Sequence, residues 1–174
     1  KAMATNIRRN KIVQGASTIS QQYIKNLYLD FDKTWKRKIE EAFLTLELEV
    51  HYDKDDILEG YLNTINYGQG NMGIVNAASY YFNKKPSELT LEEAIILAGI
   101  PKNPSRYNPV SNYDESIKRA KIVAQAMFNN GYIDEAMLNN LFKEKIDIYG
   151  QTKSNNLQMV MYYQDAVLNE LNNI

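Results

Sequence analysis

Apolar residues recur at spacings of three and four along most of the chain, which is the period of amphipathic α-helices. The clearest example is a predicted helix over residues 34–51, in which Thr34 can act as the N-cap. One continuous apolar stripe follows this helix, a pattern typical of the face by which a helix packs. Glu41 falls on nearly the opposite side when residues are placed about 100° apart. The stripe comprises Trp35, Ile39, Ala42, Phe43, Leu46 and Val50.

Cap residues, glycine-rich turns and Gly–Pro breaks divide the rest of the chain into further helices. No internal repeat and no convincing set of strands is visible, so the pattern predicts a mainly α fold. The predicted helices are the end of one at 2–11, one at 19–29 after the N-cap candidates Ser17 and Thr18, one after Asp53, a short one at 74–82, one from the Thr90–Glu93 capping box to Gly99, and two or three more at 114–129, 134–145 and 157–172.

The composition fits one globular domain, since the 174 residues are 44% apolar and 24% charged. The absence of cysteine excludes disulfides and thiolate metal sites, and a single His51 argues against a histidine-rich metal site. No apolar run approaches the roughly 20 residues that a membrane-spanning helix needs.

The net charge of −1 conceals an uneven distribution. Residues 1–41 contain nine Lys and Arg against four Asp and Glu, a net +5, so the remainder carries −6. A basic first third predicts an anionic partner such as phosphate, nucleic acid or a membrane surface. A solvated charged face explains the same charges equally well.

Two polar groupings could carry chemistry. Glu41 lies near Arg37 and Lys38 on the second face of its helix, where two leucines accompany it, and a carboxylate between cations is a catalytic candidate. The alternative is an ordinary surface Glu–Arg pair. Gln21, Gln22 and Lys25 lie close together at the start of the preceding helix.

The backbone N–H groups of that helix, at Ser17 and Thr18, would also favour an anion. Amides, an ammonium and a helix N-terminus suit a sugar attached to phosphate. Taken alone, a capped surface helix is the simpler interpretation.

Four segments together resemble the family 51 glycosyltransferases, the peptidoglycan polymerases. They occur in the family order and cover residues 12–109, whereas residues 110–174 match less sharply. The ending MVMYYQDAVLNEL looks like the helix that leads into the transpeptidase domain of bifunctional, class A penicillin-binding proteins. The four segments are GASTISQQYIKN, RKIEEAFLTLELE, ILEGYLNTINYGQGNMGIVNAASYYFNK and LTLEEAIILAGIPKNPSRYNP.

The resemblance implies a lysozyme-like, two-lobed helical domain over residues 1–150, followed at 151–174 by a helix leading toward a transpeptidase domain. The implied substrate is lipid II, a disaccharide-pentapeptide on a polyprenyl diphosphate. The acceptor 4-hydroxyl would attack the anomeric carbon of the growing glycan chain, invert it and expel polyprenyl diphosphate, leaving a β-1,4 linkage. The implied location is the extracytoplasmic face of a bacterial membrane, with the parent protein anchored there, and phosphoglycolipids such as moenomycin would be inhibitors.

The resemblance also assigns residues. Glu41 matches a carboxylate thought to assist departure of the diphosphate, directly or through water or a metal. It is therefore the candidate ligand if a divalent cation, Mg²⁺ or Mn²⁺, takes part. Positions matching the substrate-binding motifs are Ser17, Thr18, Gln21, Gln22, Lys25, Lys33, Arg37, Lys38, Asn63 and Gly68.

The chain departs from the family pattern in three respects: two mild replacements in the first of the four segments, one change of cation, and one absent motif. Ala16 replaces a glycine, and Ser20 replaces a threonine. Lys33 stands where some relatives have arginine, which keeps the charge but loses bidentate geometry. The first family motif, E-D-x-x-F-x-x-H-x-G, supplies the general base and does not occur in the sequence. An inverting displacement needs that base, so we expect these 174 residues to be inactive alone.

Two alternatives remain from the sequence. A non-catalytic module could hold a lipid-linked sugar without reacting. A lytic transglycosylase on the same fold would have no diphosphate to neutralise, which leaves the cluster of Lys25, Lys33, Arg37 and Lys38 without a purpose. Nucleic acid is not an expected partner because no reader motif and no interleaving of aromatic and basic residues accompany the charge.

Overall fold

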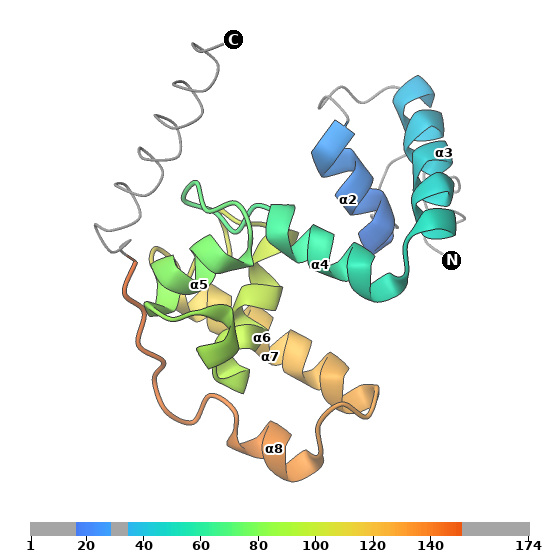
Figure 1. The fold of residues 1–174 in the computed structure, drawn as a ribbon. Helices are drawn as coiled ribbons and strands as arrows, with labels where there is room; N and C mark the ends of the chain where they lie inside the picture. Colours follow the sequence, from blue (N-terminus) through green and yellow to red (C-terminus); the bar gives the residue numbers. More distant parts are fainter. Residues whose placement is uncertain (1–16, 29–34, 151–174) are drawn as a thin grey trace, which may run out of the picture. The chain divides into compact units, whose positions relative to one another are not determined.

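The computed structural model of the chain describes residues 17–28 and 35–150. Within those ranges the secondary structure is helical, and extended backbone pairs only at an isolated bridge between Asn66 and Met72 (Figure 1). The predicted mainly α class is therefore confirmed. The chain divides into two compact units, a first unit at Lys1–Ile65 and a second unit at Asn66–Ile174.

Three helices of the first unit are described, and α2 packs against both of the others. Ile24 of α2 and Ile57 of α4 supply buried apolar side chains, at 3% and 5% exposure. α2 and α4 cross closely at Gly60, where a Cβ would lie 2.5 Å from the Tyr23 hydroxyl and 2.6 Å from Cζ. The helices are α2 (Ile19–Tyr28), α3 (Trp35–His51) and α4 (Lys54–Thr64).

Two of the predicted caps of the first unit, Thr18 and Asp53, are present, whereas the other candidate for α2, Ser17, does not cap it. Thr18 Oγ1 accepts from Gln21 N, and Gln21 Oε1 accepts from Thr18 N, both at 3.2 Å, which is the reciprocal arrangement of a capping box. Asp53 Oδ1 accepts from the backbone of Asp55 and Asp56 at the start of α4. The predicted cap of α3, Thr34, and the predicted helices at 2–11 and 157–172 lie outside the described residues.

The packing of α3 is the reverse of the predicted one. The apolar stripe is exposed, with Ile39, Phe43, Leu46 and Val50 between 65% and 79% accessible. The opposite face, which carries Glu41 and Thr45, is buried at 2% and 5%. Because α2 packs on α3 and Leu44 and Leu48 flank Glu41 there, the second face has enough apolar area to form the contact.

The second unit packs α6 against α5 and α7 (Figure 1). Tyr81, Phe82, Ile96, Ile100 and Ala120 are at most 1% exposed and form its core. The elements are α5 (Ile74–Phe82), η1 (Pro86–Glu88), α6 (Leu91–Gly99), η2 (Ile100–Lys102), α7 (Tyr113–Asn129) and α8 (Glu135–Asn140).

Most element bounds of the second unit agree with the sequence patterns, including the Thr90–Glu93 capping box of α6. The prediction for 134–145 is too long, because α8 ends at Asn140. Leu141 adopts an extended conformation there, and its side chain is 9% exposed. After α6 the chain continues directly into the short helix η2.

The crossing of α2 and α4 gives a test of the fold. Alanine normally stabilises a helix relative to glycine by about 1 kcal/mol. At Gly60 the methyl would meet the Tyr23 ring, so we expect Gly60→Ala to destabilise the protein by about 1–2 kcal/mol, since overpacking outweighs propensity. In a Tyr23→Ala background the same substitution should become stabilising. Chemical unfolding of the four proteins measures the difference, and an unchanged sign in the two backgrounds contradicts this packing.

Candidate functional site

Three of the predicted site residues meet at the interface of α2 and α3. Lys38 Nζ forms an ion pair and hydrogen bond with Glu41 Oε1 one turn along α3. The same ammonium donates to Ser17 Oγ, 3.4 Å away and 21 residues earlier in the chain. We call Ser17, Lys38 and Glu41 the Lys38 cluster.

Burial distinguishes the two charges of this cluster. The Glu41 side chain is 2% exposed, whereas that of Lys38 is 46% exposed. A carboxylate removed from water is stable only when it is paired. The partly exposed Lys38 supplies the positive charge that balances the buried Glu41 carboxylate. The sequence placed both Arg37 and Lys38 beside Glu41. The structure shows the contact with Lys38, and the side chain of Arg37 lies outside its described part. The surface-pair alternative fails for Glu41, because this carboxylate is buried.

The cluster presents a cation toward solvent on a fixed support. Lys38 has three N–H donors, of which Glu41 and Ser17 occupy two directions, and its exposure leaves the ammonium accessible. Thr45 Oγ1 donates to the backbone oxygen of Glu41 at 2.6 Å, which fills the same buried face. Such an ammonium can hold a phosphate oxygen.

The start of α2 differs from the predicted anion site. Thr18 N was expected to be free, yet it donates to Gln21 Oε1, so the cap already uses that donor. Gln21 therefore has a capping role. Gln22 instead bridges α2 and α4, since its Nε2 donates to the Ser17 carbonyl at 3.4 Å and its Oε1 accepts from the Tyr61 hydroxyl at 3.3 Å.

Tyr61 was missed by the sequence reasoning. Its hydroxyl is half-buried, and burial raises its pKa above the usual value. The only available signal was its place in the YLN segment that carries the family resemblance. A pattern cannot say that this tyrosine reaches a glutamine 39 residues earlier.

The remaining candidates do not join the Lys38 cluster in the described structure. Lys25 is exposed on α2 and makes no hydrogen bond or ion pair with any described residue. Lys33 lies outside the described residues, and Arg37 is described only as part of the α3 backbone. Asn63 is exposed and lines a separate cavity of about 440 Å³. Tyr23, Leu27, Leu48, Tyr52, Asp56, Ile57, Glu59 and Gly60 line that cavity with it.

Gly68 belongs to the second unit, where it shapes the glycine loop. Its φ of +84° and the Pro104 carbonyl, 3.2 Å from where a Cβ would stand, both require glycine. Asn71 N and Nδ2 donate to the Gly68 carbonyl at 2.9 and 3.0 Å, and the Tyr81 hydroxyl donates to the Tyr67 carbonyl at 2.8 Å. The loop is therefore internally fixed.

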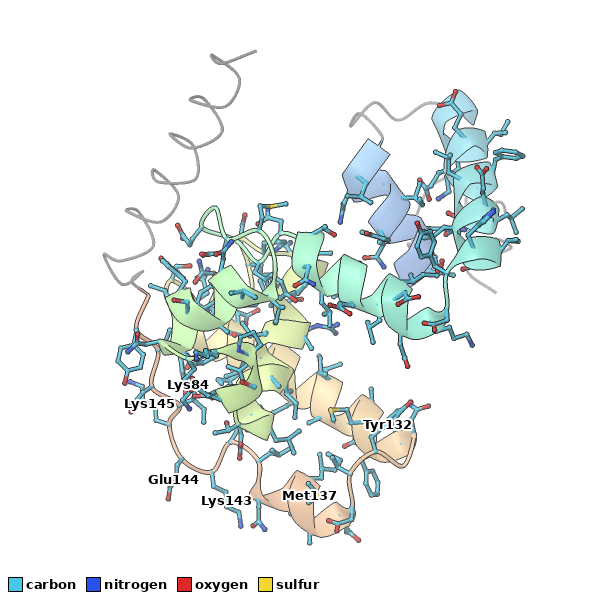
Figure 2. All side chains as sticks on the ribbon, in the orientation of Figure 1. Lys84, Tyr132, Met137, Lys143, Glu144 and Lys145 are labelled. Atoms are coloured by element: carbon cyan, nitrogen blue, oxygen red, sulfur yellow. The ribbon has the colours of Figure 1, made fainter. Side chains whose placement is uncertain are left out.

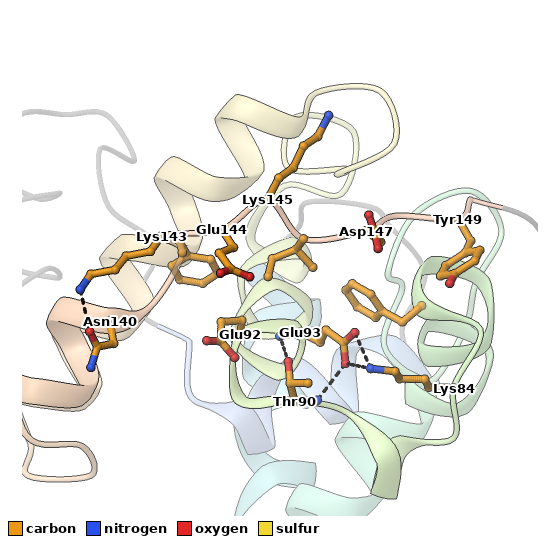
Figure 3. A pocket seen from close by; sticks show the side chains of 13 residues that line it. Lys84, Thr90, Glu92, Glu93, Asn140, Lys143, Glu144, Lys145, Asp147 and Tyr149 are labelled. Carbon is orange, nitrogen blue, oxygen red and sulfur yellow. Dashed lines mark hydrogen bonds and ion pairs between the residues drawn. The ribbon is translucent and has the colours of Figure 1, made fainter.

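The second unit contains a cavity of about 450 Å³ that the sequence did not indicate (Figure 3). On its wall, Lys84 Nζ contacts both oxygens of the buried Glu93 at 2.8 and 2.9 Å. Thr90 N donates to the same carboxylate at 2.8 Å, so the pair completes the cap of α6. The segment after α8, which carries Lys143, Glu144 and Lys145, passes along the cavity (Figures 2 and 3).

Among residues 17–28 and 35–150, no group of three His, Cys, Asp or Glu side chains is placed to hold a metal ion. Glu41, the predicted candidate ligand, is instead paired with Lys38. Participation of a divalent cation stays a prediction from the family resemblance. None of the described helices is both long and apolar enough to span a bilayer.

Comparison with known proteins gives a consistent assignment. The transglycosylase family matches residues 1–128. Penicillin-binding protein 2D of Bacillus subtilis (strain 168) is 47% identical over 159 residues, which cover 91% of this chain and 23% of that protein. Penicillin-binding protein 1A of Aquifex aeolicus (strain VF5) is 38% identical over 167 residues, covering 96% of this chain and 23% of that protein.

Among solved structures, penicillin-binding protein 1A from Haemophilus influenzae aligns with a TM-score of 0.49 at 25% identity, over 88% of this chain and 20% of that one. The chain thus spans about a quarter of the length of the curated relatives described above. The mainly helical architecture and the extent of the family match agree on the class of domain. The chain belongs to the transglycosylase family, the family 51 glycosyltransferases of class A penicillin-binding proteins.

The Lys38 cluster predicts an unequal effect of two lysine substitutions. Lys38→Met would leave the buried Glu41 carboxylate without its partner. We expect the free energy of unfolding to fall by about 1–3 kcal/mol. This is less than the roughly 3–5 kcal/mol for breaking a fully buried pair, because water reaches Lys38. The exposed Lys25 is the matched control, and Lys25→Met should change stability by less than about 0.5 kcal/mol.

Hydrogen exchange of the α2 and α3 amides in the full-length protein measures this loss locally. Equal protection in the two variants would show that Glu41 does not depend on Lys38.

Proposed function

We propose that the chain is the core of a peptidoglycan glycosyltransferase that polymerises lipid II into β-1,4-linked glycan and releases polyprenyl diphosphate with inversion. The observation that carries the proposal is the Lys38 cluster. Its members Ser17, Lys38 and Glu41 come from two separate family-like segments and converge through direct contacts in the first unit. Family membership supplies the class of reaction.

The leaving group explains why a cation is held in this way. A diphosphate gains negative charge as the glycosidic bond breaks, and fixed donors aimed at that charge lower the barrier. Lys38 is held on one side by Glu41, which limits the motion of its ammonium while leaving it accessible to a phosphate oxygen. The Ser17 hydroxyl lies beside it as a further hydrogen-bonding group.

The Lys38 cluster would thus form a binding site for the diphosphate, which we call the diphosphate subsite. Other cations would extend it. Lys25 is exposed and makes no hydrogen bond or ion pair with a described residue, so its ammonium is available to a ligand. Lys33 and Arg37 match family positions for the same task by sequence. With Lys38 they are four of the nine cations in residues 1–41, and they would favour an anionic substrate.

Glu41 holds the cation and is not the base in this account. A general base must reach the acceptor hydroxyl, whereas the Glu41 side chain is 2% exposed and its Oε1 is engaged by Lys38. The base would come from the family's first motif, which does not occur in these 174 residues. We therefore expect residues 1–174 alone to bind lipid II without polymerising it.

The proposed setting follows from the substrate. Lipid II is held in a membrane by its polyprenyl chain, so the enzyme would work at the extracytoplasmic face of a bacterial membrane, in contact with the growing glycan. The relatives named above are penicillin-binding proteins, which supports a transpeptidase domain in the same parent chain.

Binding of lipid II to the full-length protein tests the proposal. Lys38→Ala and Lys25→Ala should each weaken binding about tenfold, the effect of one lost charge-assisted hydrogen bond. Lys121→Ala is the control, because Lys121 is an exposed lysine of α7 in the second unit and should bind as the wild type does. Titration of a fluorescent lipid II in detergent gives the dissociation constants. Equal affinities for all four proteins, or no saturable binding by the wild type, contradict the proposed function.

A further inference from the structure

A continuous line of side-chain contacts leads from α4 to the Lys38 cluster. The Tyr61 hydroxyl donates to Gln22 Oε1 at 3.3 Å, and Gln22 Nε2 donates to the Ser17 carbonyl at 3.4 Å. The Ser17 hydroxyl in turn accepts from Lys38 at 3.4 Å, and Lys38 pairs with Glu41. Three helices of the first unit thus contribute to one line of contacts.

The Tyr61 end of this line determines the orientation of an amide. The two ends of a glutamine amide are chemically opposite, one accepting and one donating, and either could face Ser17. A hydroxyl hydrogen directed at Oε1 fixes the oxygen toward α4, which leaves Nε2 to face the Ser17 carbonyl. Burial raises the pKa of Tyr61, so its hydroxyl keeps its proton and remains a donor at neutral pH.

Ser17 needs such a support because of where it lies. It is exposed, precedes the first residue of α2 and stands one residue before the Thr18 cap. Besides the hydrogen bond from Lys38 to its hydroxyl, the described contact that holds Ser17 is the one between its backbone carbonyl and Gln22. Loss of that restraint would let the hydroxyl move away from Lys38.

We propose that Tyr61 is a positioning residue for the diphosphate subsite, acting through Gln22 to hold Ser17 against Lys38. The inference rests on the proposed function, because it assigns Tyr61 to the same site. Packing between α2 and α4 is supplied separately by the Tyr23–Gly60 contact and by Ile24 and Ile57. The hydroxyl of Tyr61 can therefore be removed while the ring and the crossing remain.

The test removes that hydroxyl alone. Tyr61→Phe in the full-length protein should weaken binding of fluorescent lipid II about fivefold, the effect of one net hydrogen bond on the site. Tyr52→Phe is the control, because Tyr52 is 57% exposed and lines the separate cavity of the first unit. Gln22→Met, which keeps a similar shape but cannot accept from Tyr61, should produce the same loss from the other side of the bond.

The coupling to Lys38 separates positioning from a general structural effect. In a Lys38→Ala background, Tyr61→Phe should weaken lipid II binding by less than about twofold, since the ammonium that it positions is gone. A structural defect would lower affinity by the same factor in both backgrounds, and that result would overturn the inference.

The remaining outcomes distinguish this inference from the proposed function. If wild type binds lipid II and Lys38→Ala weakens binding, but Tyr61→Phe binds like Tyr52→Phe, the positioning role is wrong and the proposed function stands. If wild type does not bind lipid II, both are overturned.

Discussion

The burial of one carboxylate is the constraint on which the first unit depends. Glu41 lies in the contact between α2 and α3, where an unpaired charge would cost several kcal/mol. Lys38 removes that cost only if it stays close to Glu41. The ion pair therefore fixes an ammonium at the edge of the interface, half in water, beside the start of α2. A structural requirement and a binding requirement are met by the same cation.

The neighbouring helices α2 and α4 place further polar groups beside the Lys38–Glu41 pair. The capping box of Thr18 and Gln21 begins α2 at a defined residue, which places Ser17 next to Lys38. The close crossing of α2 and α4 brings Tyr61 to Gln22. In the second unit the same principle recurs, since the buried Glu93 is satisfied by Lys84 and by the cap of α6. Both buried carboxylates, Glu41 and Glu93, are thus paired with a lysine.

The sequence predicts the helices well because their ends carry local chemistry. Asp53 and the Thr90–Glu93 box act within three residues of themselves, so their roles are visible in the chain alone. The packing face of α3 could not be predicted this way. Both faces contain apolar residues, and the larger stripe, with Phe43, is the exposed one because α2 covers the side of Glu41.

The sequence predicted only part of the candidate site, because family resemblance selects residues without showing which side chains they contact. Family resemblance selected Ser17, Lys38 and Glu41, and the structure joins them. The resemblance could not separate Gln21, which caps a helix, from Gln22, which bridges two. Nor could it find a contact such as that of Tyr61, which depends on how α4 crosses α2.

A crystal structure of the full-length protein with an unreactive lipid II analogue tests the central claim most directly. The account predicts diphosphate oxygens within hydrogen-bond distance of Lys38 Nζ and Ser17 Oγ, with Glu41 still paired to Lys38. A diphosphate bound elsewhere, for example beside Lys84 and Lys143 in the cavity of the second unit, would contradict it.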